Sequence, residues 1–191
     1  GIGRAVAIGF AKAGANLVLN SRSDSAEMEE TQKLIAENSN SKSVAVFGSV
    51  ADKEVAETLS KTAVSEFGSL DVLINNAGVV RDKPLMLMRD SDWSDVVDTN
   101  LTGVFECTRA AARPMMQQRS GRIISISSIS AISGRIGQSN YAAAKAGVIG
   151  FTKSITRELG RFNILSNALM IGLVNTEMTQ KIPREQFEKM K

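Results

Sequence analysis

Short apolar segments alternate with longer amphipathic segments along nearly the whole chain. The apolar segments have the length of strands, which we expect at residues 16–20, 43–47, 71–74, 122–127 and 163–168. The amphipathic segments have the period of helices, which we expect at residues 3–13, 24–38, 52–67, 91–118 and 139–160, with a short one from Pro183. Strands separated by helices in this way form a parallel sheet covered on both faces. The sequence therefore predicts an α/β fold with a doubly wound, Rossmann-type sheet, in a single domain over residues 1–191.

The bulk composition argues against several classes of protein. The chain has 191 residues, of which 43% are hydrophobic and 23% charged, as in an ordinary globular protein. No apolar run approaches the roughly 20 residues that cross a bilayer, and no signal-peptide pattern opens the chain. The net charge of +3 is spread among acidic residues, which gives nucleic-acid binding little support. We therefore predict a protein of the cytoplasm or an organelle matrix, with neither a membrane nor a nucleic acid as partner.

The chain has no histidine, and Cys107 is its one cysteine. Ser-His-Asp and Cys-His hydrolases are therefore excluded, and so is nearly every catalytic zinc site of known pattern, so we predict no metal. Cys107 falls in a helical segment, where we expect a buried structural thiol. A group that moves protons near neutral pH must then be a Tyr, Lys, Asp or Glu with a perturbed pKa.

Tyr141 and Lys145 are the candidates for that proton chemistry. Residues four apart lie on the same face of a helix, so the Lys145 ammonium can lie beside the Tyr141 phenol and lower its pKa from about 10. Ser128 ends an apolar strand thirteen residues before Tyr141. Its hydroxyl can hold a substrate oxygen where the phenol reaches it. The spacing indicates acid–base chemistry on a carbonyl or alcohol.

Glycines at positions 1 and 3 open the first predicted helix. Free backbone amides and the helix dipole favour anions at such an end, and glycine lets a pyrophosphate come close. The pair Gly1 and Gly3 therefore indicates a dinucleotide site, although the same pattern also occurs in plain loops.

Longer motifs carry a resemblance to a known family. They are Gly1-Ile2-Gly3-Arg4-Ala5, Asn75-Asn76-Ala77-Gly78, and the segment Gly137-Gln138-Ser139-Asn140-Tyr141-Ala142-Ala143-Ala144-Lys145-Ala146-Gly147. With them the chain resembles the short-chain dehydrogenase/reductases, and within that family it is most similar to the 3-oxoacyl-(acyl carrier protein) reductases, as far as about Lys181. The first motif begins midway through the family's T-G-x-x-x-G-x-G fingerprint. The resemblance therefore implies a fragment of a longer chain, with the first and last strands missing, and a homo-oligomer, dimer or tetramer, for the whole protein.

The resemblance implies a catalytic set of Asn100, Ser128, Tyr141 and Lys145. In the family, the residue at the position of Asn100 kinks its helix and holds a water in a proton relay with the lysine. Ser127 is an adjacent candidate for the serine, but the thirteen-residue interval to Tyr141 selects Ser128.

The resemblance also implies cofactor contacts from several parts of the chain. These residues are Gly1, Ile2, Gly3, Ser21, Arg22, Ser49, Val50, Asn76, Ala77, Gly78, Tyr141, Lys145, Val174 and Thr176. Family members that prefer NAD carry an acidic residue where this chain has Ser21, and Arg22 can grip a 2′-phosphate, so NADPH is favoured over NADH. Ser49 replaces an aspartate that usually contacts the adenine. Ile171 replaces a proline, which predicts a more flexible last loop.

The predicted function is NADPH-dependent reduction of a 3-oxoacyl thioester in fatty-acid synthesis. Its partner is then an acidic acyl carrier protein, for which a cluster of arginines offers a docking patch: Arg119, Arg122, Arg157 and Arg161. One alternative is a hydroxysteroid or other small-alcohol dehydrogenase of the same family. An alternative of another class is a non-catalytic dinucleotide-binding or structural subunit, because a fold does not fix a function.

Overall fold

The computed structural model describes residues 1–174 as an alternation of helices and strands. The helices are α1 (Ile2–Lys12), α2 (Ala26–Asn38), α3 (Lys53–Phe67), α4 (Asp90–Val97), α5 (Gly103–Gln118), α6 (Ser130–Ser133) and α7 (Ser139–Leu159). The strands are β1 (Leu17–Ser21), β2 (Ser43–Phe47), β3 (Val72–Asn75), β4 (Gly121–Ser128) and β5 (Ile164–Ile171). Three short helical turns complete them: η1 (Leu85–Leu87), η2 (Asp98–Thr102) and η3 (Gly160–Phe162).

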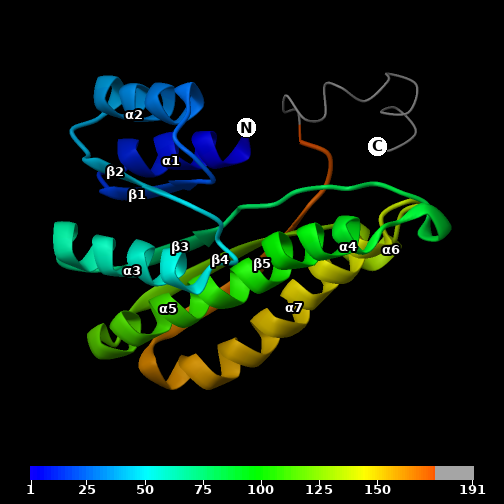
Figure 1. The fold of residues 1–191 in the computed structure, drawn as a ribbon. Coiled ribbons are helices and arrows are strands. Elements are labelled where there is room, and N and C mark those ends of the chain that lie inside the picture. The colour runs from blue at the N-terminus through cyan, green and yellow to red at the C-terminus, as the bar shows by residue number, and fades with distance from the viewer. Residues whose placement is uncertain (175–191) are drawn as a thin grey trace.

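All strand pairs are parallel, as the predicted α/β Rossmann-type fold requires. β1 pairs with β2, and β4 pairs with β3 on one side and β5 on the other. Figure 1 shows α1 and α2 on one side of the strands and α3, α5 and α7 on the other. The fold class predicted from the alternation of apolar and amphipathic segments is confirmed.

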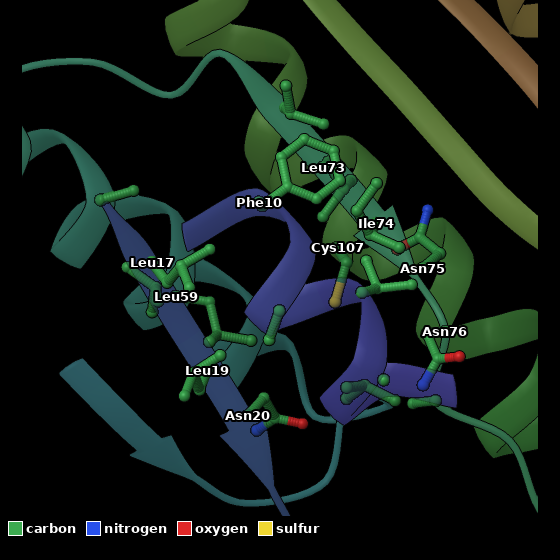
Figure 2. A pocket seen from close by; sticks show the side chains of 18 of the residues that line it. Phe10, Leu17, Leu19, Asn20, Leu59, Leu73, Ile74, Asn75, Asn76 and Cys107 are labelled. Atoms are coloured by element: carbon green, nitrogen blue, oxygen red, sulfur yellow. The ribbon is translucent and has the colours of Figure 1, made fainter. Parts of the chain in front are cut away.

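A gap divides the strands into two sheets. Among residues 1–174, no strand lies between β1 and β3, and a cavity of about 730 Å³ separates them. Figure 2 shows its apolar lining, with Leu19 from β1, Leu73 from β3, Phe10 from α1 and Leu59 from α3. The gap lies where the predicted fold has its first strand. Cys107 of α5 also borders it, and burial raises the pKa of this thiol to about 11, as befits a structural residue.

A cluster of buried residues holds α5 and α7 against β4 and β5. Its buried residues are Ala111, Met115, Ile123, Ile155, Leu159 and Ile164. Burying a side chain the size of isoleucine contributes about 1.5–3 kcal/mol, so this cluster holds the two helices firmly on the sheet. The carboxyl end of β4 and the start of α7 are thereby set beside each other.

Two sequence predictions need correction. The helix expected over 91–118 is divided, because the π-helical turn η2 separates α4 from α5. Strand β5 extends to Ile171, whose carbonyl accepts a hydrogen bond from the Ile129 amide at 3.1 Å. Ile171 itself is paired with β4, and the greater flexibility of the last loop stays a prediction. The helix expected from Pro183 lies outside the described residues.

Within residues 1–174, no helix combines the length and the apolar character that crossing a membrane requires.

Candidate active site

Ser128, Tyr141 and Lys145 meet where β4 ends and α7 begins. Ser128 is the last residue of β4, and Tyr141 and Lys145 share one face of α7. The Lys145 Nζ lies 5.7 Å from the centre of the Tyr141 ring. It also donates a hydrogen bond of 2.7 Å to the carbonyl of Ile126, which fixes the ammonium against β4. The spatial proximity predicted from the four-residue spacing is present.

The two adjacent serines at the end of β4 have different partners. The Ser127 hydroxyl donates to the Lys145 carbonyl at 2.9 Å and so holds α7 on the strand. The Ser128 hydroxyl instead acts on the Tyr141 phenol and lowers its pKa, and Ser128 Oγ accepts from the Ser130 amide at 3.2 Å. Successive side chains of a strand point to opposite faces, which explains the difference. Ser128, the residue selected by spacing, is therefore the one that faces Tyr141.

The electrostatics of Tyr141 differ from the sequence prediction. Burial raises the pKa of this phenol, the hydrogen bond from Ser128 lowers it, and the Asp82 carboxylate raises it, with a net increase. The net lowering of this pKa that the sequence predicts is therefore not found, because desolvation of the phenol has the largest effect and Lys145 does not contribute to the shift. Burial also lowers the pKa of Lys145, to about 8. Tyr141 is held in its protonated form, which is the form that can donate a proton.

Asn100 lies in the π-helical turn η2 and is fully buried. Its Nδ2 donates to the carbonyls of Val79 and Val96 at 2.8 and 2.9 Å, and its Oδ1 accepts from the Val79 amide at 3.2 Å. Both hydrogens of the Asn100 carboxamide are thus donated to backbone carbonyls, so a water in the predicted relay could hydrogen-bond to this side chain only at Oδ1. The bonds tie the loop after β3 to the α4–α5 segment.

Gly78 lies where this loop approaches two residues of the predicted catalytic set, Asn100 and Lys145. A Cβ on Gly78 would lie 2.6 Å from Oδ1 of Asn100 and 3.7 Å from Nζ of Lys145. Only glycine leaves room for this approach, so Gly78 brings Asn100 and Lys145 to the same loop.

The start of α1 offers the features of an anion site. Its N-cap residue is Gly1, so no capping side chain binds the first backbone amides of the helix. No atom lies within 4 Å of the place where a Cβ on Gly1 would be. A Cβ on Gly3 would lie 2.8 Å from Nδ2 of Asn76, so this helix end packs closely on the end of β3 (Figure 2). The free amides and open approach fit a pyrophosphate. Ile2, the first residue of the helix, belongs to the same end.

Part of the predicted cofactor-binding set lines the cavity between β1 and β3. Six of the predicted set line the cavity together: Gly1, Gly3, Ser21, Val50, Asn76 and Ala77. Ser49 precedes Val50 and accepts a hydrogen bond from the Ala51 amide, so its hydroxyl caps the turn after β2. Arg22 is exposed, and its guanidinium donates to Thr99 Oγ1 at 3.4 Å. Val174 does not line this cavity, and Thr176 lies outside the described residues.

Comparison with known proteins decides the family. The family model described as short chain dehydrogenase matches residues 1–186. This chain belongs to the short-chain dehydrogenase family. It is 44% identical over 193 residues to a 3-oxoacyl-[acyl-carrier-protein] reductase FabG of Staphylococcus aureus, covering 100% of this chain and 77% of the relative. A 3-oxoacyl-[acyl-carrier-protein] reductase of Synechocystis is 42% identical over 185 residues, covering 97% and 74%.

A solved structure agrees with this family. One matching crystal structure, from Sinorhizobium meliloti 1021, carries the name of a short-chain alcohol dehydrogenase. The match has a TM-score of 0.91 and a sequence identity of 32%, and it covers 99% of this chain and 75% of that one. The protein is therefore an oxidoreductase that acts on CH–OH groups with a nicotinamide dinucleotide cofactor.

In this short-chain dehydrogenase, a recess of about 220 Å³ opens beside Ser128. Its other lining residues come from the turns after β4 and β5: Ile129, Ser130, Ser133, Arg135, Gly172 and Leu173. Sequence reasoning missed Ser130, and it also missed Asp82 and Gln138, which are linked to it by hydrogen bonds. No local pattern marks these residues, because their contacts join segments far apart in the chain.

Proposed function

We propose that this dehydrogenase reduces the carbonyl of 3-oxoacyl thioesters carried by acyl carrier protein, with NADPH as cofactor. The pairing of Ser128 with a protonated Tyr141, beside a recess that Ser128 lines, carries the proposal. Relatives that are 40 to 44% identical and named 3-oxoacyl-[acyl-carrier-protein] reductase support the choice of substrate. Fatty-acid synthesis is the corresponding process.

The chain's own residues account for the proton half of the reaction. The nicotinamide, when bound, supplies the hydride. Tyr141 donates its proton to the carbonyl oxygen, and the Ser128 hydroxyl donates a hydrogen bond to the same oxygen, which stabilises the negative charge that develops there. Lys145 supplies a positive charge beside the phenol and, in the proposed complex, a hydrogen bond to the cofactor ribose. Asn100 holds the Val79 loop in place and completes the relay.

The surroundings of the recess suit an acyl thioester. Exposed apolar side chains flank the site, namely Leu85, Met86, Leu87, Ile132 and Ile136. The Lys83 amide donates to the Gly137 carbonyl at 2.9 Å, so the segment leading to η1 lies against the segment that carries Ile136. Apolar surface next to a polar catalytic pair fits an acyl chain that ends in a reactive carbonyl.

Two arginines of the patch predicted for the carrier protein lie far from Ser128. Arg122 stands at the start of β4, where it donates to the Asn163 carbonyl, and Arg119 donates to the Arg161 carbonyl beside it. Ser128 lies at the other end of the same strand, roughly 20 Å away at 3.3 Å per residue. We therefore propose that an acidic carrier approaches the exposed Lys83 and Arg135, which lie at the catalytic end.

The NADPH preference rests on the end of β1. Ser21 brings no carboxylate to repel a 2′-phosphate, and the exposed Arg22 can donate charge-assisted hydrogen bonds to it. A small-alcohol dehydrogenase remains the second candidate, because the matching crystal structure carries that name.

The test measures oxidation of NADPH by the protein with a 3-oxoacyl thioester, a hydroxysteroid's ketone and a small ketone as substrates. We expect the thioester to have the highest kcat/KM, and a thioester without the 3-oxo group to give no turnover. Tyr141→Phe keeps the ring but removes the proton, so kcat should fall by at least ~100-fold while NADPH still binds in a fluorescence titration. Highest kcat/KM with a steroid or small ketone would overturn the substrate assignment, and near-normal activity of Tyr141→Phe would overturn the mechanism.

A further inference from the structure

The loop after β3 is joined to the start of α7 by three hydrogen bonds. The Lys83 amide donates to the Gly137 carbonyl at 2.9 Å, and Asn140 Nδ2 donates to the Arg81 carbonyl at 3.2 Å. Between them, Gln138 Nε2 donates to Asp82 Oδ2 at 2.9 Å. Gln138 is only 9% exposed, although Asp82 is at the surface. A buried carboxamide thus spans two segments that are 56 residues apart.

The carbonyl oxygen of the Gln138 carboxamide is connected to Ser128 through Ser130. Ser130 Oγ donates to Gln138 Oε1 at 3.3 Å, and the Ser130 amide donates to Ser128 Oγ at 3.2 Å. The orientation of the carboxamide follows from chemistry, because the Asp82 carboxylate only accepts and so must face the NH₂ group. The carbonyl oxygen is then left for Ser130.

This chain of bonds determines how the Ser128 hydroxyl can be used. A hydroxyl has one hydrogen to donate and two lone pairs that accept. The Ser130 amide occupies one lone pair of Ser128 Oγ, so the hydroxyl hydrogen is directed elsewhere, and Tyr141 is its partner. Ser128 can stabilise a developing oxyanion only as a donor. The Ser130 turn therefore has to keep its position for Ser128 to act.

We propose that Gln138 is a positioning residue for the reaction, which holds the Ser130 turn against Asp82 so that the Ser128 hydroxyl points at Tyr141 and at the substrate oxygen. This role rests on the proposed function of Ser128 and Tyr141. Gln138 does not itself reach the reacting atoms; it acts through Ser130. Loss of the carboxamide lets the turn move, and a displacement of about 1 Å at a catalytic donor can lower the rate roughly 100-fold.

Asp82 affects the same site in a second way. Its carboxylate raises the pKa of Tyr141, whereas the Ser128 hydrogen bond lowers it. The other charged groups on this side are Lys145 on α7 and the cations of the Asp82 loop, Arg81 and Lys83; of these, Arg81 is paired with Asp95 at 3.3 Å. Removing Gln138 weakens the Ser128 bond, and removing the Asp82 charge leaves that bond in place. The two changes therefore move the Tyr141 pKa in opposite directions.

The test uses the fact that Tyr141 is the one tyrosine in the sequence. Phenolate absorbance, with Tyr141→Phe as the blank, reports the titration of this residue directly and needs no substrate. We expect Gln138→Met to raise the midpoint of the titration. We expect Asp82→Asn to lower it, because the asparagine oxygen still accepts from Gln138 but carries no charge. Gln117→Met, an exposed glutamine on α5, is the matched control and should leave the midpoint unchanged.

Kinetics supply the second readout. Gln138→Met should lower kcat about 10- to 100-fold with little change in the KM for NADPH, and Asp82→Asn should lower it far less. Gln138→Glu keeps the shape but, when ionised, cannot donate to Asp82, so its activity should recover as the pH falls and the new carboxyl is protonated. Unchanged tyrosine titration together with unchanged kcat in Gln138→Met would refute the role of Gln138. The titration remains valid if the thioester is not the substrate, so the two proposals fail separately.

Discussion

Lys145 is an ammonium buried at 3% exposure, and the structure implies that it costs the folded protein stability. Burial lowers its pKa from 10.5 to about 8, a difference that corresponds to about 3 kcal/mol of penalty on the charged form. The hydrogen bond from Nζ to the Ile126 carbonyl offsets roughly 1.5 kcal/mol of this. Lys145→Met removes both effects while keeping an unbranched side chain. We therefore expect the variant to be more stable than the parent at pH 7 by about 1–2 kcal/mol.

The sign of this difference should change with pH. Because the folded-state pKa is below the unfolded value, the unfolded state binds more protons between pH 8 and 10.5. The parent's stability therefore rises, relative to the variant, across that window and is constant below it. Across the window the parent gains about 3 kcal/mol relative to the variant, so above it, where the amine is neutral and keeps its hydrogen bond, the parent should be the more stable protein by about 1–2 kcal/mol.

Urea unfolding followed by Trp93 fluorescence, repeated from neutral pH to the top of this window, measures the stability difference at pH 7 and its change with pH. Lys153→Met on the same helix is the matched control, because Lys153 is exposed and its removal should change stability by less than about 0.5 kcal/mol at every pH. A variant that is less stable than the parent by the same amount throughout would refute the burial penalty. The stabilised variant should nonetheless be nearly inactive, since the charge beside Tyr141 is lost.

Two further predictions concern the loop after β3 and the cofactor. Gly78→Ala places a Cβ 2.6 Å from the buried Asn100 Oδ1, so urea unfolding should show a loss of stability of about 1–3 kcal/mol. Gly9→Ala is the control: Gly9 lies in a helix with no atom within 4 Å of the added Cβ, so this change should be neutral or stabilising. Equal stability of both variants would contradict the packing argument. Arg22→Asp should lower the ratio of kcat/KM for NADPH over NADH at least about tenfold, because it removes a phosphate partner and adds a repulsive charge. A parent enzyme that already prefers NADH would show the cofactor assignment to be wrong.

Local periodicity was enough to predict most of the secondary structure and part of the site. The strand at Ser43–Phe47 was predicted at its observed bounds, and α7 differs by one residue at one end, because apolar periodicity records which face each segment buries. The nearness of Tyr141 and Lys145 was equally predictable, since helix geometry alone sets it. The extension of β5 to Ile171 was not, because it depends on pairing with β4 rather than on the residues of the strand.

The electrostatic state of the site was decided by the tertiary structure. A sequence shows that Lys145 is near Tyr141, but the pKa of each depends on how much water the fold removes, and here burial is the largest influence on both pKa values. The contact between Gln138 and Asp82 joins residues 56 apart, so no local pattern could indicate it. The same reason explains why Arg119 and Arg122 proved to lie at the far end of β4. Spacing along the chain determines which residues share a helix face or a strand end, whereas solvent exclusion and contacts between distant segments exist only once the helices and sheets have packed.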